Sequence, residues 1–167
     1  PDGNIVELQE ILDPIVPFFA DDRYSALNPL RRIPLLIDGD VVIADSTVIC
    51  EYLEERYPTP SILPGSAADR ARTRWLDEYA DSRMAQACIW GAFAKAVVVP
   101  GIFKAPLDLD AIAQHMATGV PEVMDVLERN APDSGFVAGQ IGLGDISVAS
   151  QFANLRWARQ TIDASRW

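Results

Sequence analysis

The sequence predicts a small α/β piece followed by an all-helical bundle. Two short β-branched runs, 33–37 and 41–44, flank Asp38-Gly39-Asp40, and that pattern is typical of a β-hairpin. Residues 58–66 contain three prolines and a glycine, a composition typical of a linker. After the linker, apolar residues recur at helical spacing. We therefore expect an α/β domain at 1–58, an all-helical domain at 66–167 and, between them, an exposed linker at 59–65 with few contacts other than those of Ile62 and Leu63.

Composition narrows the classes of partner. The chain has 167 residues, of which 49% are hydrophobic, so it is long and apolar enough to bury a core. Its formal net charge is -10 and its longest basic run is Arg31-Arg32, whereas nucleic-acid binding needs clustered cations. The most apolar stretch, around 87–99, is too short to span a bilayer. We expect neither nucleic acid nor membrane as a partner.

The cysteines suggest a reducing compartment. Cys50 and Cys88 lie far apart, in no metal-binding or redox spacing, so we expect both to be buried apolar groups. No stretch has the pattern of a signal peptide. We therefore expect a cytoplasmic protein without a metal.

The first part of the chain predicts a strand, an irregular connection, the hairpin and a helix. Residues 5–12 alternate between apolar and polar, which favours a strand. Residues 13–28 contain breakers and favour an irregular, partly helical connection. From Ser46 the apolar residues fall on one helical face, and Pro58 should end that helix.

The second part predicts three long helices. Ser66 and Asp69 have the spacing of a capping box, opening a helix that runs toward Pro100-Gly101. Asp108 should start the next helix, which Gly119-Val120-Pro121 should bend or break. Asp145 should cap the third helix.

The conspicuous single side chains of this part have ordinary interpretations. We expect the tryptophans at helical spacing to be core residues, and lone His115 to lie on the surface. The tryptophans in question are Trp75, Trp90 and Trp157.

Two short motifs are candidates for binding. Ile33-Pro34 enters the hairpin, and by base rate alone the bond is trans and the proline simply marks an edge strand. Asp45-Ser46 starts a helix, and both residues are ordinary N-caps. A helix start also attracts a carboxylate, which the Ser46 hydroxyl could bind while Asp45 holds an ammonium group. We favour binding over capping alone.

An ordered set of motifs resembles the glutathione transferase family. The resemblance covers nearly the whole chain, and it implies an α/β thioredoxin-like N-terminal domain, incomplete here, followed by an all-α domain in a homodimer. The residues that carry it are Asn28-Pro29-Leu30, Ile33-Pro34-Leu35-Leu36, Asp38-Gly39-Asp40, Asp45-Ser46, the helix end 52–58 and Gly142–Ile146. In the last of these motifs, Gly142 replaces the family's usual Ser or Thr.

The resemblance also implies a glutathione site. Ile33-Pro34 would be cis, so that the Ile33 backbone faces the ligand as a neighbouring strand would. Asp45 and Ser46 would hold the γ-glutamyl end, although many family members carry Glu or Gln at the position of Asp45. Arg32 would reach the glycyl carboxylate or the thiol region; a solvated surface residue is an equally good interpretation.

The function implied is transfer of the glutathione thiolate, with glutathione as co-substrate, to a small hydrophobic electrophile. Trp75 and Tyr79 could line the electrophile's cleft. One alternative is a non-catalytic protein of this fold used for regulation or assembly; another is a glutathione-dependent isomerase, lyase or disulfide reductase. In the family the thiol-activating Ser, Tyr or Cys precedes the strand expected at 5–12, and further helices follow the position of Trp167. The resemblance therefore implies a sequence shortened at both ends, with no catalytic residue or subclass assigned.

Overall fold

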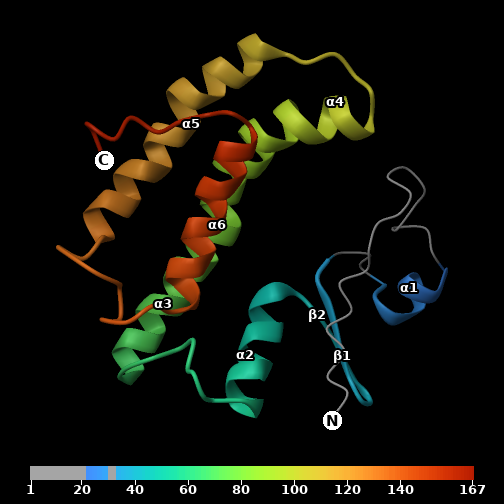
Figure 1. Ribbon diagram of the computed structural model, residues 1–167, viewed down its shortest axis with the longest axis vertical. Helices are drawn as coiled ribbons and strands as arrows, with labels where there is room; N and C mark the ends of the chain where they lie inside the picture. Colours follow the sequence, from blue (N-terminus) through green and yellow to red (C-terminus); the bar gives the residue numbers. More distant parts are fainter. Residues whose placement is uncertain (1–21, 30–32) are drawn as a thin grey trace. The chain divides into compact units, whose positions relative to one another are not determined.

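The computed structural model describes residues 22–29 and 33–167 (Figure 1). They fall into two compact units, which divide between Pro60 and Ser61. The strand expected at 5–12 lies outside the described residues, as do Arg32 and residues 13–21 of the expected irregular connection. The first unit contains a two-stranded sheet and the second is helical, in the order that the sequence predicts.

A hairpin forms the described sheet of the first unit. Strand β1 (Leu35–Asp38) pairs with β2 (Val41–Ala44) in antiparallel register, from Leu35 opposite Ala44 to Asp38 opposite Val41. The loop is Gly39-Asp40, and Gly39 has φ +59°, a conformation that glycine adopts without steric cost. Two-residue loops with positive φ match the twist of the strands that they join. The predicted hairpin is confirmed.

Two helices accompany the hairpin. Helix α1 (Asp22–Leu27) falls inside the connection expected to be partly helical, and α2 (Ser46–Arg56) follows β2 directly. Of the apolar face expected for α2, only Ile49 is buried. The Tyr52 hydroxyl donates a hydrogen bond of 2.7 Å to Asp38 Oδ2, which ties the middle of α2 to the loop end of β1.

The linker is exposed at both ends and buried between them. Thr59 and Pro60 are exposed, but Leu63 and Pro64 are buried in the helical unit. The Ile62 carbonyl accepts a hydrogen bond of 2.7 Å from Leu143 N–H. The contacts expected of Ile62 and Leu63 are present, and Pro64 is buried as well, which the sequence did not predict.

The second unit is built around one long helical run. Helices α3 (Ala67–Tyr79), η2 (Ala80–Val98) and α4 (Val99–Ile102) follow each other without interruption, and η2 is wound as a π-helix. The predicted capping box is confirmed: Asp69 N–H donates to Ser66 Oγ at 3.3 Å, and Ser66 N–H donates to Asp69 Oδ2 at 3.0 Å. The run passes through Pro100-Gly101, where the sequence predicted its end.

Length and composition alone would allow this run to cross a membrane. It has 36 residues, and its most apolar window has a mean hydropathy of 1.4. The sequence analysis judged the most apolar stretch too short to span a bilayer. That judgement is wrong for the whole helical run, because it considered only residues 87–99. A core helix passes the same test, however, and here Met84, Cys88 and Ala92 pack inside the bundle.

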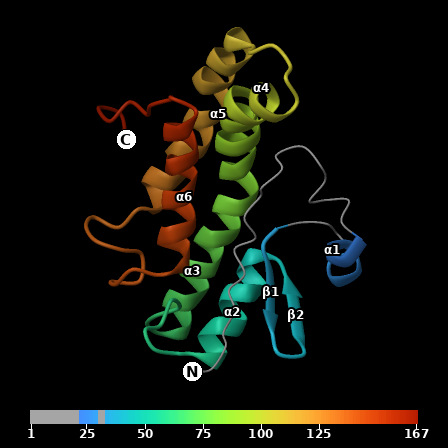
Figure 2. The same ribbon diagram turned by 45° about the vertical axis from the view of Figure 1, so that its right-hand side comes forward.

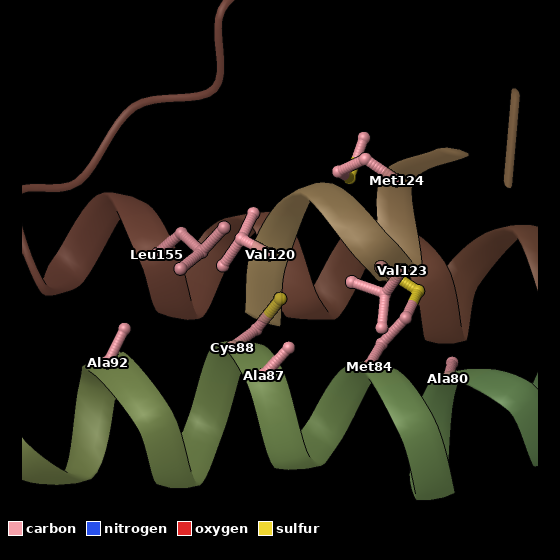
Figure 3. Packing of buried hydrophobic residues seen from close by; sticks show 9 residues of the cluster. All are labelled: Ala80, Met84, Ala87, Cys88, Ala92, Val120, Val123, Met124 and Leu155. Atoms are coloured by element: carbon pink, nitrogen blue, oxygen red, sulfur yellow. The ribbon is translucent and has the colours of Figure 1, made fainter. Parts of the chain in front are cut away.

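Two further helices complete the bundle. Helix α5 (Leu109–Asn130) begins where Asp108 accepts a hydrogen bond of 2.9 Å from Ala111 N–H, as predicted. Helix α6 (Leu143–Trp157) is capped by its third residue, Asp145, whose carboxylate accepts a hydrogen bond of 2.9 Å from Gly142 N–H. Figure 3 shows the core that η2, α5 and α6 share. Its buried residues are Ala80, Met84, Ala87, Cys88, Ala92, Val120, Val123, Met124 and Leu155.

Of the bend or break expected in α5, the break is wrong. The helix continues through Pro121, although proline lacks the N–H that would bond one turn back. Val120, Val123 and Met124 lie on both sides of the proline and belong to the same core. Packing of these side chains therefore outweighs the local preference for a break.

The tryptophans are not core residues. Trp75, Trp90 and Trp157 are 46%, 60% and 75% exposed. The inward positions of η2 are held mainly by small residues such as Ala80, Ala87 and Ala92, with Met84 and Cys88 between them (Figure 3). Small side chains let the helices approach closely, and the indoles lie outside.

His115 is not a surface residue either. It is half-buried, and its Nε2 lies 3.0 Å from the Ala87 carbonyl, so Nε2 carries the hydrogen and donates it. A Cβ on Gly91 would lie 1.9 Å from Nε2, and one on Gly119 would lie 2.8 Å from Cε1. The two glycines make the space for the imidazole between η2 and α5.

Candidate functional site

The open end of the hairpin brings the two sequence-predicted motifs together. Because Leu35 pairs with Ala44, the residues just before Leu35 and just after Ala44 lie at the same edge of the sheet. Ile33-Pro34 and Asp45-Ser46 occupy those positions, and Figure 2 shows α2 beginning there. We call these four residues the hairpin corner.

Ile33-Pro34 forms the entry side of the hairpin corner. The bond is cis, which confirms the expectation drawn from the family resemblance. Both residues are exposed, and the Ile33 side chain is 59% accessible. Ile33 lies beyond the last ladder pair of the sheet, so its backbone is placed to meet an extended ligand at the sheet edge.

Asp45 caps α2 from a strained backbone conformation. Its φ is 91° and its ψ is 126°, and residues other than glycine rarely adopt a positive φ. Such conformations cost about 1–3 kcal/mol and are concentrated at functional sites. Asp45 Oδ1 accepts a hydrogen bond of 3.2 Å from Val48 N–H. The carboxylate is therefore a helix cap, and Oδ2 is the atom that would have to hold a ligand's ammonium group.

Ser46 is the first residue of α2 and is exposed. The first turn of an α-helix carries N–H groups without partners inside the helix, and its positive dipole end favours an anion. No acidic residue follows Asp45 in this first turn. A carboxylate placed over Ser46 could accept hydrogen bonds from the backbone and from the hydroxyl.

Two features of the hairpin corner have little or no sequence signal. The positive φ of Asp45 is one, because aspartate is not diagnostic of that conformation. The other is the bond from Tyr52 to Asp38, which raises the pKa of Tyr52 and joins residues that are distant in sequence. That bond fixes the direction of α2 relative to the hairpin, and hence the position of Ser46.

The two cysteines differ in how deeply they are buried. Cys50, in α2, is only half-buried, whereas Cys88 is buried as expected. Burial raises the pKa of Cys88 to about 11, so its thiolate is scarce at neutral pH. Across residues 22–29 and 33–167, no group of three or more His, Cys, Asp or Glu side chains is placed to hold a metal ion.

Trp75 and Tyr79 lie in the helical unit and stack, with ring centroids 5.4 Å apart. Trp75 lines a hollow of about 540 Å³ together with Arg72 and Arg129. The Tyr79 hydroxyl donates to the Val123 carbonyl at 3.1 Å, which makes it a link between helices.

Comparisons with known proteins point to one family. The model of the glutathione S-transferase N-terminal domain matches residues 7–61. Glutathione S-transferase U14 of Arabidopsis thaliana is 35% identical over 150 residues, which are 80% of this chain and 56% of that protein. Maleylpyruvate isomerase of Ralstonia sp. is 47% identical over 55 residues, which are 33% of this chain and 26% of that protein.

A solved structure agrees with the sequence matches. The theta-class glutathione S-transferase of Xanthomonas axonopodis pv. citri, with glutathione bound, superimposes with a TM-score of 0.68 at 26% identity. The match covers 86% of this chain and 66% of that one. The predicted fold class, a thioredoxin-like domain followed by a helical domain, is confirmed. The chain spans a little over half the length of the transferase that it matches along most of its sequence.

Proposed function

Because this chain belongs to the glutathione transferase family, we propose that its hairpin corner binds glutathione for transfer of the thiolate to a small hydrophobic electrophile. The observation that carries the proposal is the hairpin register, which brings Ile33-Pro34 and Asp45-Ser46 to one edge at the start of α2. That edge combines an exposed backbone segment with an anion-attracting helix end. Glutathione offers a peptide backbone and an α-carboxylate beside an α-ammonium group.

Each group of the hairpin corner has a role in this proposal. Ser46 donates hydrogen bonds to the α-carboxylate from its N–H and its hydroxyl, and Asp45 Oδ2 accepts from the α-ammonium. The Ile33 backbone pairs with the peptide unit around the cysteinyl residue, and Pro34 sets the direction of that backbone. Arg32, from the sequence pattern alone, is proposed for the glycyl carboxylate. The reaction needs the thiolate, since the thiol is a weak nucleophile.

A glutathione-dependent isomerase is the second candidate. The specific support is the Ralstonia maleylpyruvate isomerase, whose 47% identity is confined to 55 residues. We further propose a cytoplasmic homodimer; the molar mass in solution by light scattering tests the dimer.

Calorimetric titration with glutathione tests the binding site. Ser46→Ala keeps the backbone donor and removes one hydrogen bond to a charged group, which is worth about 1.5–3 kcal/mol. We expect glutathione to bind roughly tenfold more weakly or worse. Asp45→Asn should lower the affinity for glutathione, but it should not change the affinity for an analogue that lacks the α-amino group.

The cap of α3 supplies matched controls in the other unit. Ser66→Ala and Asp69→Asn are the same chemical changes at a helix start where we propose no ligand. Both should leave the affinity for glutathione unchanged. If Ser46→Ala and Asp45→Asn bind glutathione as tightly as these controls, the hairpin corner is only a cap.

Consumption of a chloronitrobenzene, measured against isomerisation of maleylpyruvate, distinguishes the transferase reaction from the isomerase reaction.

A further inference from the structure

The loop end of the hairpin contains an Asp-Gly pair to which the proposed function gives no role. Asp38 is the last residue of β1, and Gly39 begins the two-residue loop. In such a pair the glycine amide nitrogen can attack the aspartate Cγ, because glycine has no Cβ that would shield the nitrogen. The product is a five-membered succinimide ring, which water later opens.

The surroundings of Gly39 leave this reaction sterically open. The strand ladder ends at the pair of Asp38 and Val41, so Gly39 lies outside it. Gly39 is exposed, and a Cβ built on it would meet no heavy atom within 4 Å beyond its chain neighbours. In the part of the chain that the structure describes, neither strand pairing nor a packed side chain at Gly39 opposes ring closure.

One contact restrains the carboxyl group that would be attacked. The Tyr52 hydroxyl donates a hydrogen bond of 2.7 Å to Asp38 Oδ2. Ring closure replaces the charged carboxylate by a neutral imide carbonyl and moves Cγ onto the Gly39 nitrogen. A hydrogen bond to a charged acceptor, which is stronger than one between neutral groups, is therefore lost. The Tyr52 hydroxyl stabilises the starting carboxylate and should slow the reaction.

We propose that Asp38 is a site of spontaneous isoaspartate formation, which the Tyr52 hydroxyl restrains. The Gly39 nitrogen bonds to Asp38 Cγ, and the bond from Cγ to one carboxyl oxygen breaks. That oxygen leaves as water, with one proton from the nitrogen and one from the carboxyl group or the solvent. Water then opens the ring: attack at Cγ restores aspartate, and attack at the main-chain carbonyl carbon gives isoaspartate. The net change is an isomerisation without oxidant or reductant.

The product would disturb the hairpin corner. In isoaspartate the main chain runs through Cβ and Cγ, so the loop gains a backbone atom and the α-carboxylate becomes the side chain. Because the turn fixes the register of a hairpin, the pairing of Leu35 with Ala44 should weaken. Tyr52 also loses the acceptor that ties α2 to β1. The expected loss of glutathione binding rests on the proposed function, whereas the modification itself does not.

The first test locates the modification in the full folded chain. The wild-type protein is kept for weeks at neutral pH in water enriched in oxygen-18, so that each ring opening adds one heavy oxygen. Trypsin then releases residues 33–56, because they lie between Arg32 and the next cleavage site after Arg56. We expect mass spectrometry to find the heavy oxygen at Asp38.

The same peptide contains its own controls. Asp40 and Asp45 are followed by Val41 and Ser46 and not by glycine, so both should stay unlabelled. Asp2-Gly3, the other Asp-Gly pair of the sequence, falls in a different peptide and cannot confuse the result. An unlabelled peptide, or equal labelling at Asp40 or Asp45, would overturn the proposal.

The second test concerns the restraint. Tyr52→Phe removes the hydroxyl and should raise the labelling rate at Asp38 roughly tenfold. Tyr57→Phe is the same chemical change directly after α2 and should leave the rate unchanged. Amide hydrogen exchange of Val41 measures hairpin opening in each variant. An unchanged labelling rate in Tyr52→Phe, or a rise no larger than that of the Val41 exchange, refutes the role of the hydroxyl.

Asp38→Asn serves if Tyr52→Phe does not fold. It keeps a carbonyl oxygen that can accept from Tyr52, and it forms the same ring with ammonia as a better leaving group. The variant should lose its amide faster than the wild-type chain takes up heavy oxygen. An amide that persists would show that the Gly39 nitrogen does not reach residue 38, which contradicts the proposal.

Calorimetric titration separates this inference from the proposed function. After ageing, the fraction of chains that bind glutathione should fall in step with the fraction of isoaspartate at residue 38. Full binding by a sample rich in isoaspartate would refute the effect on the hairpin corner. If the fresh chain itself does not bind glutathione, the proposed function fails, and the labelling result still decides whether Asp38 is modified.

Discussion

The helical bundle and the hairpin, together with the start of α2, are specified by different physical properties of their residues. In the bundle, nine buried residues from three helices fill one core. In the hairpin, Ile33, Ile37 and Val42 are exposed, and the buried apolar side chains among the described residues of that unit are Tyr24 and Ile49. The special residues there, Gly39 and Asp45, are distinguished by backbone angles. The volume of buried side chains therefore constrains the bundle. Backbone conformation constrains the hairpin and the start of α2.

The largest expected effect tests the role of volume. Met84→Ala removes a fully buried side chain and should cost about 2–5 kcal/mol of unfolding free energy, as large-to-small core changes do. Val42→Ala, at an exposed strand position, should cost less than about 1 kcal/mol. Urea denaturation measures both. Equal losses would show that the hairpin depends on side-chain burial as much as the bundle does.

Substitutions at two glycines distinguish the effect of side-chain volume from the effect of backbone conformation more sharply. Gly91→Ala places a Cβ 1.9 Å from His115 Nε2, so the imidazole must move and lose its bond to the Ala87 carbonyl. We expect a loss of about 1–3 kcal/mol, as in other overpacked cores. Gly39→Ala meets no atom within 4 Å, but its φ of +59° should cost an L-residue about 1–2 kcal/mol.

The rescue experiments for these glycines differ. His115→Ala should reduce the destabilisation that Gly91→Ala causes, because it opens space for the new Cβ. It should not reduce the destabilisation that Gly39→Ala causes. Gly39→Asn should be milder than Gly39→Ala, because asparagine tolerates positive φ. Gly101→Ala, in a helix with open space around it, is the control and should be neutral or slightly stabilising. Thermal unfolding of these variants is the measurement, and identical rescue of both sites would remove the distinction.

The smallest expected effect concerns the start of α3 and its pH dependence. Hydrogen bonds from Ser66 lower the pKa of Asp69 below its ordinary value of 3.8. A lowered folded-state pKa stabilises the protein fully above pH 3.8, and this contribution is lost as the pH falls through the folded-state value. Ser66→Ala should cost about 1 kcal/mol at pH 7.

The difference between Ser66→Ala and the wild-type chain should narrow below pH 3.8, when Asp69 protonates. It should not vanish, because Ser66 Oγ also accepts from Asp69 N–H. Denaturation at pH 7 and pH 3 measures the change. A difference that widens in acid would contradict this account of the cap.

Local patterns in the sequence predicted the parts of the structure that depend on neighbouring residues. The hairpin followed from Asp38-Gly39-Asp40, and the starts of α3 and α5 followed from Ser66 and Asp108. These elements close over a few residues, so short-range hydrogen bonding and turn preferences determine them. The meeting of Ile33-Pro34 with Asp45-Ser46 follows from the hairpin register for the same reason.

Features that depend on distant partners were missed. Nothing near Pro121 indicates that α5 continues through it, because the compensating contacts come from η2 and α6. The half-buried position of His115 depends on Gly91, and the position of Trp167 depends on Asp125 in α5. A tryptophan at helical spacing also has no local sign of facing outward. Such outcomes require knowledge of which helices are neighbours.

The hydrogen bond between Ile62 and Leu143 has a consequence for synthesis of the chain. Its partners are 143 − 62 = 81 residues apart, and Leu143 starts the last helix of the bundle. Chains grow at roughly 5–20 residues per second. For about 4–16 seconds after Ile62 is made, its carbonyl therefore has no access to this partner. During that interval Pro64 also lacks its neighbour Gly142, the residue before α6, and a chaperone or protease would meet this segment uncovered.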